Sequence, residues 1–235
     1  MQLQRKYISE MWISKEIEYD DYLHDIPAVK YLKNKRLKFN RNVTFFVGEN
    51  GMGKSTLVEA LAISLRLNPE GGNRTFRFET ENTHSELGYC ITTSKEDFPK
   101  DYFFMRADGF YNFATEFGGG KRFEDFHEMS HGEGFLSMIH KGFFGNGLYI
   151  LDEPESALSP QNILRLICEI KRLENMESQM IIATHSPILM AYPGAEIYYF
   201  TDAGINIVDY RQTEHFIITK AFLECPERML NYMLE

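Results

Sequence analysis

A glycine-rich run near residue 50 has the residue types and spacing of a phosphate-binding loop. The segment Gly48-Glu49-Asn50-Gly51-Met52-Gly53-Lys54-Ser55 matches the pattern G-x-x-x-x-G-K-[ST]. Glycines let successive backbone N–H groups turn toward one anion. The lysine can reach the β- and γ-phosphates, and the serine hydroxyl can ligate Mg²⁺. We therefore predict that a nucleoside triphosphate with Mg²⁺ is bound by Gly48, Asn50, Gly51, Gly53, Lys54, Ser55 and Thr56.

Two further apolar runs end in residues that could act on the same phosphates. The run LYIL ends in Asp152 and Glu153, and the run MIIA is followed by Thr184 and His185. We predict that Asp152 holds Mg²⁺ together with Ser55 and that Glu153 polarises the attacking water. His185 could contact the γ-phosphate. The alternative is that two solvated acids cap a strand and that the histidine is structural.

The segment HEMSHGEG, residues 127–134, fits two patterns that exclude each other. The pattern H-E-x-x-H would bind zinc, and it requires His127 and His131 on one helical face. Ser130-x-x-Glu133 is instead a capping box, which starts a new helix at Ser130. Apolar residues then recur at the spacing of a buried helical face, at Phe135, Ile139 and Phe143. We favour the capping box, in which Ser130 and Gly132 at a helix N-terminus face a phosphate.

The elements that must position these residues alternate between strands and helices. Strands are predicted in VTFFVG (43–48), GLYILDEPE (147–155) and QMIIATHSP (179–187), and helices at 54–67 and 159–175, the second with Ser159 as N-cap. Such alternation predicts an α/β fold with a mostly parallel central sheet. In these sheets ligands bind at the carboxyl ends of the strands, where all three predicted strands carry polar residues.

The remaining segments are predicted to extend one ATPase domain that spans residues 1–235. Short β-type runs within 74–106 (RTFRF, LGYCITT and DYFFMR) suggest a small antiparallel lobe, with the whole insertion at roughly 71–128. A closing hairpin is expected around residues 202–204. The chain from Thr213 is predicted to be mostly helical, with an interruption near Pro226 and apolar residues that pack into the core, among them Met229, Leu230 and Met233.

The composition is that of an ordinary globular protein, with 43% hydrophobic and 25% charged residues. The net charge of −9 argues against a chain that coats nucleic acid. Residues 30–41 nevertheless contain six cations and no acid, which indicates either a solvated face or a local contact with phosphates or a partner. No leader and no run long enough to span a bilayer is found. With three scattered cysteines, we expect a cytoplasmic protein without membrane insertion.

The motifs together resemble those of the ABC-type ATPases. GENGMGKST, SHGEG, LYILDEPESALS and THSP occur in this order and spacing across residues 43–187. The details are similar to the stand-alone branch of that class, related to RecF-like and SMC-like heads. The resemblance implies an ATP hydrolase that forms an ATP-sandwiched homodimer. It further implies that Ser130 and Gly132 act in trans, that Glu153 is the hydrolytic base and that residues 156–159 link the two sites.

Three departures from the class pattern distinguish this chain. His131 and Glu133 replace the Gly and Gln that transporter signatures usually carry, and Ser159 stands where Asp is common. No glutamine occurs between Gln4 and Gln161, so Asp108 is considered as a substitute near Mg²⁺. These departures weigh against an ABC transporter subunit, which is the alternative. The resemblance implies action on DNA or on a partner protein, in DNA maintenance or phage defence. A low-turnover, ATP-gated switch is the third alternative; the physiological target and the adenine contact are not assigned.

Overall fold

The computed structural model describes residues 6–18, 21–69, 71–72, 85–106 and 131–234. Its centre is a six-stranded sheet in the order β5-β6-β7-β3-β8-β9, in which only the pairing of β8 with β9 is antiparallel. The strands are β3 (Val43–Gly48), β5 (Asp101–Arg106), β6 (Gly147–Asp152), β7 (Gln179–Ala183), β8 (Glu196–Thr201) and β9 (Gly204–Ile207). The predicted α/β class with a mostly parallel sheet is confirmed.

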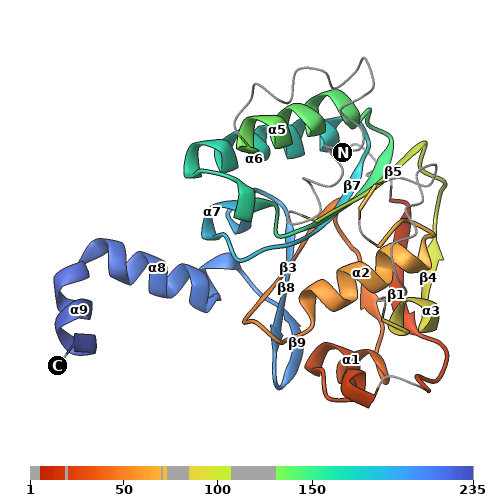
Figure 1. Ribbon diagram of the computed structural model, residues 1–235, viewed down its shortest axis with the longest axis horizontal. Coiled ribbons are helices and arrows are strands. Elements are labelled where there is room, and N and C mark those ends of the chain that lie inside the picture. The colour runs from red at the N-terminus through yellow and green to blue at the C-terminus, as the bar shows by residue number, and fades with distance from the viewer. Residues whose placement is uncertain (1–5, 19–20, 70, 73–84, 107–130, 235) are drawn as a thin grey trace.

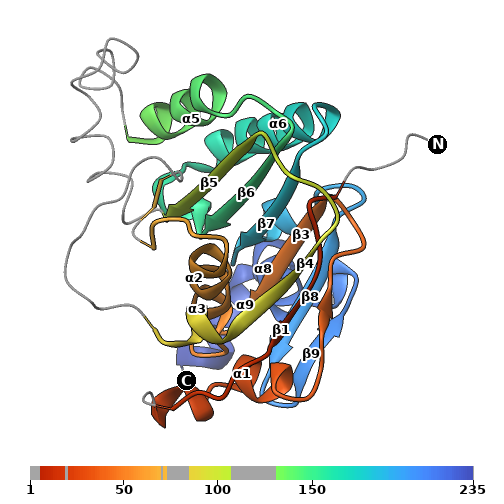
Figure 2. The same cartoon turned by 90° about the vertical axis from the view of Figure 1, so that its right-hand side faces the viewer.

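Helices cover both faces of this sheet, as Figures 1 and 2 show. One face packs against α2 (Lys54–Ser64), and the other packs against α5 (His131–Gly142), α6 (Pro160–Asn175) and α7 (Pro187–Met190). Alternate residues of each strand therefore enter different cores, as Phe46 and Phe45 do. Because both faces are covered, β3, β6 and β7 are buried along their whole length.

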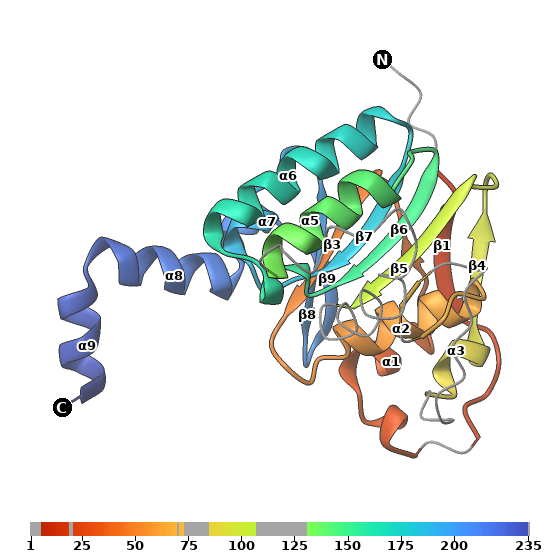
Figure 3. The same ribbon diagram turned by 45° about the horizontal axis from the view of Figure 1, so that its top comes forward.

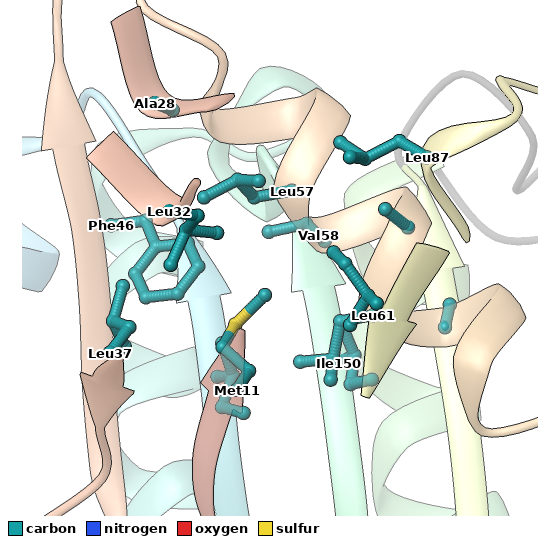
Figure 4. Packing of buried hydrophobic residues seen from close by; sticks show 14 of the residues in the cluster. Met11, Ala28, Leu32, Leu37, Phe46, Leu57, Val58, Leu61, Leu87 and Ile150 are labelled. Atoms are coloured by element: carbon teal, nitrogen blue, oxygen red, sulfur yellow. The ribbon is translucent and has the colours of Figure 1, made fainter. Parts of the chain in front are cut away.

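A second, antiparallel sheet lies beyond α2, in the order β2-β1-β4. It is formed by β1 (Ile8–Ile13), β2 (Leu37–Lys38) and β4 (Ile91–Lys95), with η1 (Asp21–His24), α1 (Pro27–Leu32) and α3 (Leu87–Cys90) nearby. Its apolar side chains, such as Met11 and Leu37, join those of α2 and the central sheet in one core (Figure 4). The helix α2 that follows the phosphate loop is therefore held between two sheets.

The predicted composition of the antiparallel lobe is wrong in three respects. The run DYFFMR forms β5, which pairs in parallel with β6 at the edge of the central sheet. The antiparallel partner of β4 is β1, from the N-terminal segment. Of the run LGYCITT, only the second part is a strand, because its first four residues form α3. The run RTFRF lies outside the described residues.

The C-terminal residues 213–234 form an arm that projects from the body of the molecule (Figures 1 and 3). Its helices are α8 (Glu214–Glu224) and α9 (Pro226–Leu234), as predicted, and the hairpin of β8 and β9 is confirmed as well. Neither of these fully described helices contains a buried residue. The prediction that Met229, Leu230 and Met233 pack into the core is therefore wrong; Leu230 and Met233 are 42% and 72% exposed. Among the described residues, no helix is long and apolar enough to cross a membrane.

Candidate nucleotide site

The ends of three neighbouring strands converge where α2 begins. Ser55 Oγ, in the first turn of α2, donates a hydrogen bond to Asp152 Oδ1 at 2.9 Å. The backbone N–H of Glu153 donates to the carbonyl of Ala183, and that of Thr184 donates to the carbonyl of Phe46, both at 3.0 Å. The polar residues that follow β3, β6 and β7 therefore share one edge of the sheet, as the sequence predicts.

The phosphate-loop backbone requires glycine at two positions. Gly53, the N-cap of α2, has φ +93°, and a Cβ there would lie 2.4 Å from Ile26 Cγ2. Gly48 has φ +152°, and its Cβ would lie 2.4 Å from the carbonyl oxygen of Phe200. At both positions, residues other than glycine disfavour the backbone conformation, and their Cβ would clash with a neighbouring atom. The loop thereby leads directly into the N-terminus of α2, whose N–H groups and dipole favour an anion.

Lys54 lies beneath this loop, with only 4% of its surface exposed. Its Nζ donates to the carbonyl oxygen of Glu49 at 2.9 Å. Burial lowers the pKa of the Lys54 ammonium, although the carboxylates of Glu153 and Asp152 act in the opposite direction. A phosphate oxygen is a stronger partner for an ammonium than a carbonyl, so the arrangement suits a triphosphate.

Glu153 has an unusual backbone for a residue other than glycine, with φ +49° and ψ +51°. This left-handed conformation is uncommon and costs energy, and residues that adopt it are frequent at functional sites. The side chain is 41% exposed, and Glu153 Oε1 lies 3.4 Å from His185 Nε2. The predicted base and the predicted phosphate sensor are therefore neighbours.

Glu155 is a site residue that the motif patterns did not identify. Its Oε1 accepts hydrogen bonds from the Thr184 hydroxyl, at 2.8 Å, and from the backbone N–H of His185. Burial raises the pKa of the Glu155 carboxyl, and these hydrogen bonds oppose that shift. The second glutamate of the DEPE segment thus ties the turn after β7 to the turn after β6.

His215 is the second residue that the sequence patterns missed. It lies in the first turn of α8, and its Nε2 is 2.9 Å from His185 Nδ1. The same Nε2 is 3.9 Å from Glu49 Oε1, in the phosphate loop. Burial lowers the pKa of both histidines. No local motif marks His215, which enters the site only because the first turn of α8 lies beside the turn after β7.

The donor set fits the nucleotide and the metal that the motif implies. Ser55 and Asp152 present two hard oxygen donors within 2.9 Å of each other, the chemistry that Mg²⁺ prefers. Thr56 lies in the same first turn of α2, while Asn50 and Gly51 are exposed at the tip of the loop. When bound, Mg²⁺ would neutralise phosphate charge. The described residues hold no group of three or more His, Cys, Asp or Glu side chains placed for a metal.

The signature segment is only partly described. His127, Ser130 and Asp108 lie outside the described residues, so neither interpretation of 127–134 is decided by side-chain geometry. From His131 onward the chain is helical, and Phe135, Ile139 and Phe143 are buried as predicted. A Cβ on Gly132 would lie 2.8 Å from Asn162 Nδ2 and 3.1 Å from the Ala157 carbonyl. This glycine therefore lets α5 pack closely against the segment that follows Glu155.

Two family models match the chain over adjoining regions. An "AAA domain" model matches residues 26–131. A model described as "AAA domain, putative AbiEii toxin, Type IV TA system" matches residues 119–191. A Haemophilus influenzae protein, described as an uncharacterized ABC transporter ATP-binding protein, is 36% identical over 73 residues, which are 31% of this chain. That match spans only 28% of the relative's own length.

Solved structures of ABC proteins share the fold. The structure of cbiO1 from Clostridium perfringens, part of the ABC transporter complex cbiONQ, has a TM-score of 0.51 at 16% identity and covers 98% of this chain and 100% of that chain. An ABC transporter in an inward-facing conformation has a TM-score of 0.52 at 14% identity, with coverages of 91% and 88%. At such identities the likeness establishes the fold and nothing further. The SMC head domain from Thermotoga maritima has a TM-score of 0.47, too low for an argument about SMC-like heads.

Proposed function

We propose that this chain, which AAA-domain models match over residues 26–131 and 119–191 and which has the fold of ABC proteins, hydrolyses ATP with Mg²⁺ inside an ATP-sandwiched homodimer. One observation carries the hydrolytic part of the proposal, namely the 2.9 Å hydrogen bond between Ser55 and Asp152. This hydrogen bond joins α2, which follows the phosphate loop, to the end of β6. The two proposed Mg²⁺ ligands and the buried Lys54 therefore lie together at the N-terminus of α2. A glycine-rich turn without this function would not need that convergence.

Each residue has a distinct role in the proposed hydrolysis. Lys54 and the loop N–H groups hold the β- and γ-phosphates. Ser55 and Asp152 hold Mg²⁺. Glu153 accepts a hydrogen bond from the water that attacks the γ-phosphorus, and the bond to the bridging oxygen of ADP breaks. His185, 3.4 Å from Glu153, contacts the transferred phosphoryl group.

The hydrolytic proposal is tested by ATP binding and phosphate release. Lys54→Ala is expected to abolish detectable binding at millimolar ATP in the presence of Mg²⁺. Glu153→Gln is expected to retain binding and to lower phosphate release by at least about a hundredfold, the scale of a lost general base. ATP binding that is equally tight in Lys54→Ala and in wild type would end the proposal.

The homodimer follows from the mode of action of the ABC class. In that mode Ser130 and Gly132 of one chain reach the γ-phosphate held by the other chain. The packing of Gly132 against Ala157 supports this arrangement. It places the signature helix beside the segment at 156–159 within each chain, so that both segments can meet the second chain together. Glu153→Gln is expected to accumulate as an ATP-bound dimer in size-exclusion chromatography with light scattering. A variant that stays monomeric with ATP and Mg²⁺ would contradict the trans arrangement.

We propose DNA or a partner protein as the target, in DNA maintenance or defence against phage. The family description that names a toxin of a toxin–antitoxin system supports a defence role. The six cations of residues 30–41 are all exposed, although Arg36 and Lys38 pair with Glu10 at 3.0 and 3.7 Å. Salt-dependent DNA binding that is lost when Lys33, Lys35 and Arg41 are neutralised would support the DNA target. If DNA binding is unchanged in this variant, the partner protein becomes the favoured target.

A transporter subunit is the second candidate, and the names of the matched ABC proteins favour it. This role requires a membrane partner, whereas the DNA role does not. Pull-down with the trapped Glu153→Gln variant, from membrane and soluble fractions separately, distinguishes the two. A third possibility, an ATP-gated switch with negligible turnover, is separated by the wild-type rate of phosphate release.

A further inference from the structure

The histidine pair at the base of the C-terminal arm is connected to the nucleotide site on both sides. His185 Nδ1 and His215 Nε2 are 2.9 Å apart, which is hydrogen-bond distance. On the other side of His185, Nε2 lies 3.4 Å from Glu153 Oε1. The side chains are 27% and 12% exposed, so both rings are largely withdrawn from water. The atoms His185 Nε2 and His215 Nδ1 are buried, and neither has a hydrogen-bond partner in the described part of the chain.

The placement of the protons follows from these contacts. A hydrogen bond between two neutral imidazoles needs one N–H and one bare nitrogen. If His185 Nδ1 carried the hydrogen, its bare Nε2 would face the Glu153 carboxylate, and a buried N–H on His215 Nδ1 would have no acceptor. If His215 Nε2 carries the hydrogen instead, His185 Nε2–H lies 3.4 Å from the Glu153 carboxylate, which attracts it, and the other buried atom without a partner, His215 Nδ1, is a bare nitrogen. Orphaned buried N–H groups are the rarer and costlier case.

We infer that His215 is a positioning residue, which donates from Nε2 to His185 Nδ1 and so holds His185 with its hydrogen on Nε2. His185 then presents a donor toward Glu153 and toward the phosphoryl group that Glu153 acts upon. The C-terminal arm thereby supplies part of the ATP site. The consequence for turnover rests on the proposed hydrolysis, whereas the proton placement does not.

The base of the arm is built to hold His215 in place. Thr213, fully buried, is the N-cap of α8, and its hydroxyl accepts from the Phe216 N–H at 3.3 Å. The same hydroxyl lies 2.7 Å from the Tyr210 carbonyl oxygen and 3.7 Å from Met190 Sδ, in α7. His215 is therefore fixed relative to the turn that carries His185. The rest of the arm has no comparable anchor, since none of its helical residues is buried.

Burial favours the neutral form of both rings, as the hydrogen bond between them requires. Burial lowers the pKa of His185, and the Lys54 ammonium lowers it further, while Glu153 and Glu49 act in the opposite direction. Burial lowers the pKa of His215 as well, against the carboxylates of Glu49 and Glu214. When both rings are neutral, one proton lies between His185 Nδ1 and His215 Nε2. The contact of His185 Nε2 with Glu153 decides which of the two nitrogens carries that proton.

The tautomer is measured directly by nitrogen NMR of histidine-labelled protein without nucleotide. In wild type, we expect His185 Nε2 to give a protonated and Nδ1 an unprotonated imidazole signal. His215→Phe, which keeps a ring but no donor, should remove the hydrogen-bond shift at His185 Nδ1. His215→Gln has an amide that can donate, and it should retain that shift. His140→Phe, at an exposed histidine on α5, serves as the matched control.

Turnover provides the second measurement. His215→Phe is expected to lower kcat for ATP hydrolysis about tenfold, with KM within about twofold, as for a lost positioning hydrogen bond. His215→Gln should stay within about threefold of wild type. If His215→Phe does not fold, His215→Ala replaces it in both measurements. Thermal unfolding of each variant is recorded first, so that a loss of fold is not taken for a loss of positioning.

Two results would overturn the inference. One is a wild-type spectrum with the hydrogen of His185 on Nδ1. The other is an unchanged His185 signal in a folded variant without a donor at residue 215. If wild type itself releases no phosphate, the proposed hydrolysis fails, and the spectra still decide the proton placement.

Discussion

At the scale of single residues, the phosphate loop separates two costs of replacing glycine. Gly53 has φ +93° and no room for a Cβ, whereas Gly51 has φ +82° with nothing within 4 Å of its Cβ position. We expect Gly53→Ala to lower the free energy of unfolding by about 2–4 kcal/mol, through left-handed strain and overpacking together. Gly51→Ala should lower it by only about 1–2 kcal/mol. Urea unfolding measures both, and equal losses would mean that Ile26 moves aside freely.

The histidine pair makes stability depend on pH. The folded-state pKa values of His185 and His215 lie below the ordinary value of 6.5, so the unfolded chain binds protons more readily. Stability contributed by the neutral pair is therefore present above pH 6.5 and is lost as the pH falls through the lowered pKa values of the folded state. Glu155 acts in the opposite direction, because burial raises its pKa.

The contribution of the two histidines to the pH dependence of stability can be separated from that of Glu155 by comparing wild type with a double histidine variant. Thermal unfolding of wild type between pH 7.5 and about 5 should show a steeper loss than that of the double variant His185→Gln, His215→Gln. Both proteins retain Glu155 and the surrounding Glu49, Lys54, Glu153 and Glu214. If the stability of both proteins falls equally with pH, the histidine pair does not contribute to the pH dependence.

The predicted site residues that the structure brings together share one property. Asp152 ends β6, His185 lies just beyond β7, and Lys54 and Ser55 begin the helix that follows β3; parallel strands bring such positions to one edge. His215 has no such signal, since its place depends on how α8 leaves the sheet. Glu155 was visible in the DEPE run, but its hydrogen bonds to Thr184 and His185 depend on the contact between two turns.

At the scale of elements, Glu155 links the turn after β6 to the turn after β7. Glu155→Ala would leave the Thr184 hydroxyl and the His185 N–H without their acceptor, so we expect a loss of about 2–4 kcal/mol in the free energy of unfolding. Glu155→Gln retains a carbonyl oxygen at that position without a charge. Its amide nitrogen would take the buried position of Oε2, which has no hydrogen-bond partner among the described residues, so we expect a loss of about 1–2 kcal/mol, smaller than that of Glu155→Ala. Chemical denaturation of the two variants decides whether the acceptor or the charge matters, and equal losses would indicate the charge.

The error at β5 shows the limit of reading an element from its neighbours. The run YFFM is continuous and apolar, which is typical of a strand buried on both faces in a parallel sheet. In the sequence, however, this run lies between polar turns and next to other short β-type runs, which favours its assignment to the antiparallel lobe. The strand β1 was not predicted at all, because its pairing with β4 joins residues about eighty positions apart. Local periodicity does not register such a contact.

At the scale of the whole molecule, the arm and the body should be energetically separate beyond the first turn of α8. Residues of α9 bury nothing, and Tyr232, Met233 and Leu234 are 87%, 72% and 81% exposed. Removal of residues 226–235 is therefore expected to change the free energy of unfolding by less than about 0.5 kcal/mol, as for surface changes generally. His215 and its N-cap remain. A large loss of stability in this truncated chain would mean that α9 packs onto the body in solution.

Gln179, at the start of β7, joins the central sheet to the antiparallel sheet through hydrogen bonds of its side chain. Its Oε1 accepts from the backbone N–H groups of Tyr7 and Ile8, at 2.8 and 3.0 Å, and its Nε2 donates to the Ile8 carbonyl at 2.9 Å. The residue is fully buried, so these hydrogen bonds replace contacts that water would otherwise make. Gln179→Leu has a similar shape but cannot make them. We expect it to lower the free energy of unfolding by about 3–5 kcal/mol.

This loss should have a recognisable spatial pattern, because β1 holds the antiparallel sheet in place through its pairing with β2 and β4. Amide hydrogen exchange in Gln179→Leu should therefore speed up first at β1 and β4, while β3 and β6 keep their protection. Gln161→Leu, at an exposed position of α6, provides the matched control and should leave both sheets unchanged. Uniform acceleration across both sheets would mean that they unfold as one unit. In that case Gln179 stabilises the whole core around α2 rather than the junction alone.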